Sequence, residues 1–193
     1  TLEEVIDTTT LPPADQGLLA ITRASLLARV GEAEEALQVL EPAVRDPALG
    51  QVGAALLSKA QLLQELDRHG EAEAVLQDVL TRFGGVADMA SAAHMGLGRS
   101  LVELGRNDEA LALYESMLDD TTDPDIRANI TQLIGQTKLA MGDRAGAAQA
   151  YTSLITSGAS PEIIANGHFG LAELAREEGR TEDAIRSLRT VIT

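Results

Sequence analysis

A glycine followed by a short helical pattern recurs five times along this 193-residue chain. The glycines are Gly31, Gly70, Gly105, Gly142 and Gly179, so the successive spacings are 39, 35, 37 and 37 residues. A repeat of this length is typical of a solenoid, in which each unit buries its apolar face against its neighbours. The recurrence constrains the fold more than any other feature of the chain, and it favours binding over catalysis.

The residues around each glycine predict two antiparallel helices per unit. Apolar residues lie at the offsets 5, 9, 12 and 13 after the glycine, which together make one face of a 3.6-residue helix. Before the glycine, a large aliphatic residue stands beside a small one, as two closely packed helices require. The glycine itself suits the left-handed conformation that ends a first helix. Pro13, Pro124 and Pro161 predict where first helices begin, with Asp123 and Ser160 as their capping residues.

The pattern resembles the tetratricopeptide repeat family. The residues that carry the resemblance are the small residues Gly98 and Gly135, the alanines Ala36, Ala110, Ala147 and Ala184, the tyrosines Tyr114 and Tyr151, and the three prolines. The chain departs from the family in its spacing, which exceeds the usual repeat of about 34 residues, and in lacking the aromatic residue of the family's pattern in the first helix. The resemblance implies an all-α, right-handed superhelical solenoid of about five helix pairs.

We expect one solenoid over residues 12–193. Its predicted units are approximately residues 12–46, 47–86, 87–122, 123–159 and 160–193. Residues 1–11 are interpreted as the remnant of a preceding helix, because aligning Pro13 with Pro124 places them at the end of a second helix. The last predicted helix ends on apolar residues without a polar cap. This indicates either a longer natural array or a homo-oligomer formed through the terminal helices.

Composition excludes several classes of function. The formal net charge of −15 argues against a nucleic-acid partner, because phosphates require a basic surface. The chain contains no cysteine, and no apolar run approaches the roughly 20 residues of a membrane span. We therefore expect a soluble protein without membrane insertion, in the cytoplasm or the periplasm. The long spacing is similar to that of bacterial envelope-assembly members of the family.

No pattern in the sequence points to a metal, a cofactor or catalysis. His94 and His168 occupy equivalent positions two units apart, so they are too distant to share a metal and are interpreted as packing residues. The carboxylates between Asp119 and Asp125 lack the spacing of a calcium loop. No nucleophile elbow, phosphate-binding glycine loop or metalloprotease helix is present. We expect a chain that is not an enzyme and holds no cofactor.

Two further glycines, Gly96 and Gly170, lie nine residues before the turn glycine of their units. A glycine inside a helix costs about 0.8–1 kcal/mol relative to alanine. Either a neighbouring helix or the backbone of a ligand must approach closely there, and packing is the favoured interpretation.

The family resemblance implies that first helices line a concave groove that binds a peptide or a protein segment. The groove is expected to be basic in the early units, through Arg29, Arg68 and Arg99, and acidic in the last unit. The candidate binding residues are Gln64, Arg68, Met95, Arg99, Asn129, Gln132, Gln136 and Phe169. The predicted function is a non-catalytic protein-interaction scaffold. The alternatives are a self-associating structural array and the interaction module of a larger envelope-assembly or regulatory protein.

Overall fold

The computed structural model describes residues 11–49 and 51–192, so the predicted helix remnant at residues 1–11 lies almost wholly outside the described residues. The described residues form ten α-helices and one short 3-10 helix, without a strand. The all-α fold of antiparallel helix pairs is thereby confirmed. Contacts divide the chain into two compact units, residues 1–100 and 101–193. The single solenoid over residues 12–193 stays a prediction.

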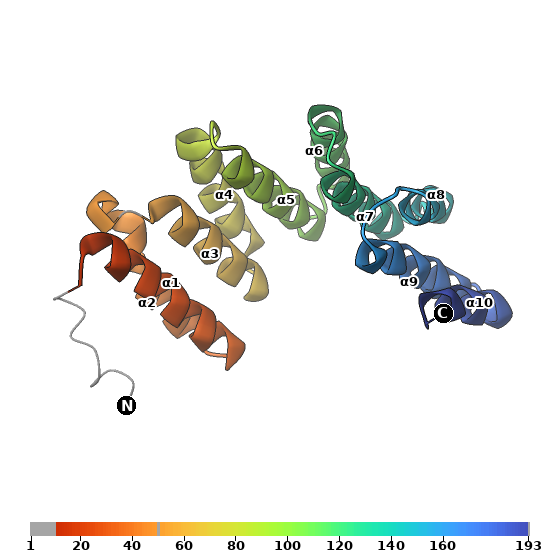
Figure 1. The fold of residues 1–193 in the computed structure, drawn as a ribbon, viewed down its shortest axis with the longest axis horizontal. Helices are drawn as coiled ribbons and strands as arrows, with labels where there is room; N and C mark the ends of the chain where they lie inside the picture. Colours follow the sequence, from red (N-terminus) through yellow and green to blue (C-terminus); the bar gives the residue numbers. More distant parts are fainter. Residues whose placement is uncertain (1–10, 50, 193) are drawn as a thin grey trace. The chain divides into compact units, whose positions relative to one another are not determined.

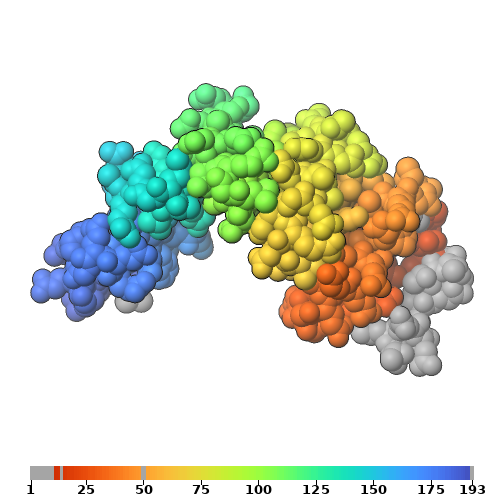
Figure 2. All heavy atoms as spheres, turned by 180° about the vertical axis from the view of Figure 1, so that it is seen from behind, coloured from red at the N-terminus to blue at the C-terminus, as the bar shows by residue number. Residues whose placement is uncertain are grey.

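The first unit contains two complete helix pairs and most of a further helix (Figure 1). Its elements are α1 (Pro13–Arg29), α2 (Ala33–Arg45), η3 (Pro47–Leu49), α3 (Val52–Glu65), α4 (His69–Phe83) and the part of α5 (Ala87–Glu103) up to residue 100. Small and aliphatic residues such as Ala36, Leu40 and Leu63 form a core between α1, α2 and α3. Side chains fill the spaces that the ribbons leave between neighbouring helices of this unit (Figure 2).

The second unit contains the remaining helices. They are α6 (Asn107–Asp120), α7 (Pro124–Ala140), α8 (Arg144–Ile155), α9 (Pro161–Glu177) and α10 (Thr181–Ile192). Tyr151 and Leu154 of α8 are buried with Ala128 of α7 and Ile163 of α9. None of the helices in the described parts of either unit combines the length and the apolarity that crossing a bilayer requires.

Four of the five expected turn glycines end a first helix in the left-handed conformation. Gly31, Gly105, Gly142 and Gly179 have φ angles of 87°, 75°, 80° and 73°. At each turn, the N–H of the following residue donates to a carbonyl five residues back, as in the bond from Arg106 to Leu101 at 2.8 Å. These bonds satisfy carbonyls that the helix end would otherwise leave unpaired. The role predicted for these four glycines is confirmed.

The expected turn at Gly70 is wrong, because Asp67 occupies that position. Asp67 has a φ of 57°, and Arg68 donates to the Leu63 carbonyl at 2.8 Å as the equivalent residues do in the other turns. Gly70 instead lies in the first turn of α4. Aspartate is one of the few residues besides glycine that tolerate the left-handed conformation. The second pair is therefore shifted by three residues relative to the sequence alignment.

The predicted helix starts at Pro13, Pro124 and Pro161 are confirmed. The Asp123 carboxylate caps α7 by accepting from the N–H groups of Asp125 and Ile126 at 3.0 Å. The Ser160 side chain makes no such bond at α9. Instead, the N–H of Ser160 donates to the carboxylate of Asp125 at 2.8 Å. Asp125 thus joins the starts of α7 and α9.

Close helix packing explains the two glycines inside first helices. A Cβ atom added at Gly96 would lie 3.1 Å from a methyl carbon of Leu76, and one at Gly170 would lie 2.7 Å from the ring of Tyr151. Leu76 and Tyr151 both stand nine residues after their turns once Asp67 is taken as the second turn. The favoured interpretation of packing is therefore correct for both glycines.

Candidate functional site

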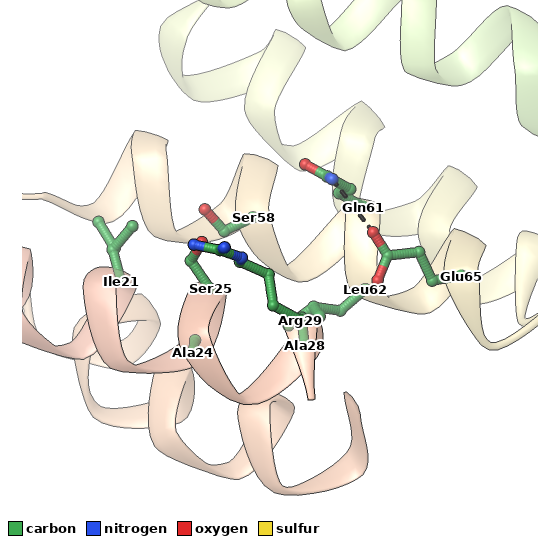
Figure 3. A pocket seen from close by; sticks show the side chains of 9 residues that line it. All are labelled: Ile21, Ala24, Ser25, Ala28, Arg29, Ser58, Gln61, Leu62 and Glu65. Atoms are coloured by element: carbon green, nitrogen blue, oxygen red, sulfur yellow. Dashed lines mark hydrogen bonds between the residues drawn. The ribbon is translucent and has the colours of Figure 1, made fainter. Parts of the chain in front are cut away.

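Two adjoining cavities lie on one face of the first unit. The larger, of about 340 Å³, lies between α1 and α3, and Figure 3 shows the side chains around it. Its lining residues are Ile21, Ala24, Ser25, Ala28, Arg29, Ser58, Gln61, Leu62 and Glu65. The smaller, of about 180 Å³, lies between α3 and α5 and shares Ser58 and Gln61 with the first. We call the two cavities together the first-unit groove.

The corrected turn explains which residues of α3 face the groove. Counting back six residues from the turn gives Ser25 in α1 and Arg99 in α5, and both line the groove. With Asp67 as the turn, the same count gives Gln61 in α3, which also lines it. Counting from Gly70 gives Gln64 instead. The sequence alignment therefore missed Gln61 and Glu65 as groove residues.

A signal for the correct register was present in the sequence. Seven residues before the five observed turns stand Ala24, Ala60, Gly98, Gly135 and Ala172, which are all small. Counting from Gly70 places Leu63 in that series, the single large residue. Requiring a small residue at the helix–helix contact would have moved the second turn to Asp67.

Gln64 holds two helices together. Its side-chain amide donates to the Gly96 carbonyl at 2.7 Å and to the Ser100 hydroxyl at 2.8 Å. Ser100 is fully buried, so this bond satisfies a polar group that water does not reach. Gln64 also lines the smaller cavity. Its amide hydrogen bonds are committed to α5, so its main role is to fix the spacing of α3 and α5.

Arg68 lies just before α4 and is paired with carboxylates. Its guanidinium contacts Glu71 at 2.7 Å and Glu34 at 3.4 Å. The hydrogen bond between Arg68 and Glu71 is the main cause that raises the pKa of Arg68 and lowers that of Glu71. Arg68 does not line either of the two cavities described above. In the corrected register, Glu65 takes the groove position expected for Arg68.

Arg29 and Arg99 do lie in the first-unit groove. Arg29 lines the larger cavity and Arg99 the smaller one. In Figure 3 the Arg29 side chain extends toward Ser25 and Ser58, while the Glu65 carboxylate accepts from the Gln61 amide at 3.1 Å. Met95 is half-buried on α5, beside Gly96. The groove thus combines apolar side chains with hydroxyl, amide, carboxylate and guanidinium groups.

The remaining candidates lie on α7 and α9 of the second unit. Asn129 and Gln136 are exposed on α7, and the Gln132 side chain accepts a hydrogen bond from the Asn166 amide at 3.1 Å. Phe169 of α9 is 53% exposed although it is a large apolar residue. The structure therefore brings Gln132 of α7 into contact with Asn166 of α9. It leaves Asn129, Gln136 and Phe169 accessible on the surface of this unit.

The acidic end expected for the groove is offset by arginines. Glu177 contacts Arg144 at 2.8 Å, and Glu173 accepts from Arg176 at 3.0 Å. The hydrogen bond to Arg176 is the main cause that lowers the pKa of Glu173. Both arginines belong to the second unit, so the carboxylates there are already neutralised by their neighbours.

His94 and His168 are both half-buried. Across residues 11–49 and 51–192, no group of three or more histidine, aspartate or glutamate side chains is arranged to hold a metal ion. The carboxylates of Asp123 and Asp125 are occupied by the backbone bonds at the starts of α7 and α9.

The chain belongs to the tetratricopeptide repeat family, which it matches over residues 21–87, 57–125 and 133–192. Its fold is similar to that of MamA from Desulfovibrio magneticus RS-1, residues 41 to the end, with a TM-score of 0.64 at 19% identity over 92% of this chain and 94% of that one. It is similar to TTC0263, a thermophilic protein of the family from Thermus thermophilus, with a TM-score of 0.67 at 19% identity over 91% and 90% of the two chains.

A tetratricopeptide repeat protein from Parabacteroides merdae ATCC 43184 has a TM-score of 0.63 at 17% identity, over 92% of this chain and 66% of that one. No curated protein matches the chain in sequence. At these identities the solved structures support the fold alone.

Proposed function

We propose that this chain is a non-catalytic protein-interaction scaffold that holds an extended segment of a partner protein in the first-unit groove. The observation that carries the proposal is the pair of adjoining cavities along α1, α3 and α5. They share Ser58 and Gln61, so a single segment crossing α3 would fill both. Membership of the family supports a protein partner.

The chemistry of the groove suits an extended backbone. Ile21 and Leu62 provide apolar surface in the larger cavity, and Leu57 does so in the smaller one. Ser58 and Gln61 offer groups that donate and accept hydrogen bonds at the centre of the groove. Backbone hydrogen bonds give affinity with modest demand on sequence, and pockets for side chains add specificity. Asn129, Gln136 and Phe169 form a further candidate contact surface on the second unit.

A blocking substitution tests the groove. Peptides selected from a random displayed library on the immobilised chain serve as probes. We expect Gln61→Trp to weaken their binding at least tenfold, because a bulky ring at the exposed Gln61 obstructs both cavities. The matched control is Gln38→Trp on the exposed face of α2. Equal binding by both variants, at unchanged helix content by circular dichroism, would refute the groove as the site.

A second candidate function is self-association through α10. Residues nine positions after the turn are buried in the other pairs, with exposures of 0% for Leu40, 2% for Leu76 and 5% for Tyr151. The equivalent Leu188 is 38% exposed, and Ile185 beside it is 46% exposed. Such a face is normally covered by the next helix of an array. Sedimentation over a range of concentrations tests this candidate, and a monomer at the highest concentration removes it.

A further inference from the structure

The charges of the first-unit groove differ from those of the rest of the chain. The chain has 30 acidic residues and 15 basic ones. Most arginines of the described residues are paired with carboxylates: Arg45, Arg68, Arg82, Arg106, Arg144, Arg176, Arg180 and Arg186. Arg127 donates to two backbone carbonyls, and Arg23 and Arg189 are engaged as well.

Arg29 and Arg99 are the two arginines for which the described residues provide no ion pair or hydrogen bond. Both line the first-unit groove, although carboxylates outnumber cations two to one in the chain. Glu65 lines the same cavity as Arg29, yet its carboxylate accepts from Gln61 instead. Figure 3 shows the Arg29 side chain extended toward Ser25 and Ser58. A guanidinium carries five N–H donors, and Arg29 lines the larger cavity.

We propose that the first-unit groove selects an extended acidic segment of a partner protein, with one carboxylate on Arg29 and a second on Arg99. The inference rests on the proposed function and specifies the charge of the ligand. Guanidinium groups bind carboxylates through two parallel hydrogen bonds. This geometry selects a negatively charged group and also fixes the orientation of the ligand carboxylate. Ser58 and Gln61, between the two arginines, contact the backbone of the segment. Glu65 disfavours a further carboxylate at its own position.

The repeat geometry sets the spacing of the two acidic residues. Neighbouring packed helices lie about 8–10 Å apart, so α1 and α5 are separated by roughly 16–20 Å across α3. An extended chain rises about 3.3 Å per residue, so this span corresponds to about five or six residues. The segment expected in the groove therefore carries aspartate or glutamate at both ends of a stretch of about six or seven residues.

Local charges decide the class of ligand despite the net negative charge of the chain. At physiological ionic strength the screening length is about 8 Å, so a bound segment responds mainly to the side chains that it contacts. Those side chains include two arginines and one glutamate that is already hydrogen-bonded. Nucleic acid is disfavoured because two arginines are too few to neutralise a run of phosphates against a net charge of −15.

Selection from a random displayed peptide library tests the inference on the whole chain. The wild-type chain and the double variant Arg29→Gln, Arg99→Gln are immobilised in parallel, with Arg45→Gln as the control. Arg45 is an exposed arginine paired with Glu41 outside the groove. We expect the wild type and the control to enrich peptides with two acidic residues about five or six positions apart. The double variant should lose this enrichment.

Binding of one enriched peptide, labelled with a fluorophore, gives the quantitative result. We expect each arginine substitution alone to weaken binding about fivefold to tenfold. Replacement of both acidic residues of the peptide by asparagine should weaken wild-type binding strongly and leave the double variant unaffected. Enrichment of neutral or basic peptides that Gln61→Trp abolishes would overturn the acidic class and leave groove binding intact. Failure to enrich any peptide would refute groove binding and the inference with it.

Discussion

Gly170 of α9 lies against the ring of Tyr151 of α8, so that a Cβ atom on Gly170 would approach two ring carbons to 2.7 Å. Such a distance requires either the ring or the helix to move. The space that accommodates the tyrosine is therefore made by the absence of a side chain on α9. Gly135 on α7 also faces the ring of Tyr151, where a Cβ would lie 2.8 Å from it.

We predict that Gly170→Ala destabilises the second unit. Overpacking a tight core contact costs about 1–3 kcal/mol, and replacing a helical glycine returns about 0.8–1 kcal/mol. The expected net loss in the free energy of unfolding is about 1 kcal/mol, measured by urea denaturation followed by circular dichroism. Adding Tyr151→Leu in a double-mutant cycle should show a favourable coupling between the two substitutions. Strictly additive effects would contradict the contact.

Tyr151 also gives the chain a dependence on alkaline pH. Burial raises the pKa of its phenol above the ordinary value of 10.0. The folded state then holds the phenol proton more tightly than the unfolded state. The contribution of Tyr151 to the free energy of unfolding is therefore fully present below pH 10.0 and is lost as the pH rises through the folded pKa. We expect Tyr151→Phe to reduce this loss. Unfolding curves measured from pH 8 to pH 11 test this expectation. If the free energy of unfolding falls equally with pH in the variant and the wild type, the phenol of Tyr151 is not buried.

The helix pairs were predictable from sequence because glycine turns and apolar offsets repeat at fixed distances. Helix starts at Pro13, Pro124 and Pro161 were predictable for a similar reason, since proline is favoured at a first helical position. The second turn was not, because Asp67 takes a conformation usually reserved for glycine while Gly70 stands nearby in α4. Because of that three-residue shift, the sequence predicted Gln64 and Arg68 at the groove positions that Gln61 and Glu65 occupy.

The partners of long side chains were less predictable than the backbone. The pairing of Arg68 with Glu34 depends on the approach of α2 to α4, which spacing alone does not give. The bond from Gln64 to Ser100 joins residues 36 positions apart. Sequence periodicity identifies which face of a helix is buried. These side-chain contacts depend in addition on how the buried faces of neighbouring helices pack together.

The corrected turn predicts that introducing glycine at one position and removing it at a neighbouring one both stabilise the chain. Asp67→Gly should raise the free energy of unfolding by about 0.5–1 kcal/mol, because glycine adopts a positive φ without the strain of a Cβ atom. Gly70→Ala should also stabilise α4, by up to about 1 kcal/mol, since a Cβ there meets nothing within 4 Å. Gly105→Ala is the contrasting control, because Gly105 has a φ of 75° and should not tolerate alanine. Thermal unfolding ranks the three variants, and a destabilising Gly70→Ala would restore Gly70 as the turn.

Gln64 is predicted to contribute to stability rather than mainly to binding. Gln64→Ala removes the donor shared by the Gly96 carbonyl and the buried Ser100 hydroxyl, which should cost about 1–2 kcal/mol. Gln61→Ala, three residues earlier and exposed to solvent, should change the free energy of unfolding by less than about 0.5 kcal/mol. Denaturation of both variants in parallel distinguishes these roles. Equal effects would mean that Gln64 does not hold α3 and α5 together.

The residue nine positions after the turn is predicted to contribute more to the free energy of unfolding in α4 than in α10. Leu76 is 2% exposed and packs against Gly96, so Leu76→Ala should cost about 2–5 kcal/mol through lost burial and a cavity. Leu188 is 38% exposed among the described residues, so Leu188→Ala should cost about 1 kcal/mol or less. Denaturation at low protein concentration measures both. If the cost of Leu188→Ala grows with protein concentration, the α10 face is covered by a second copy, because association stabilises the folded state by mass action.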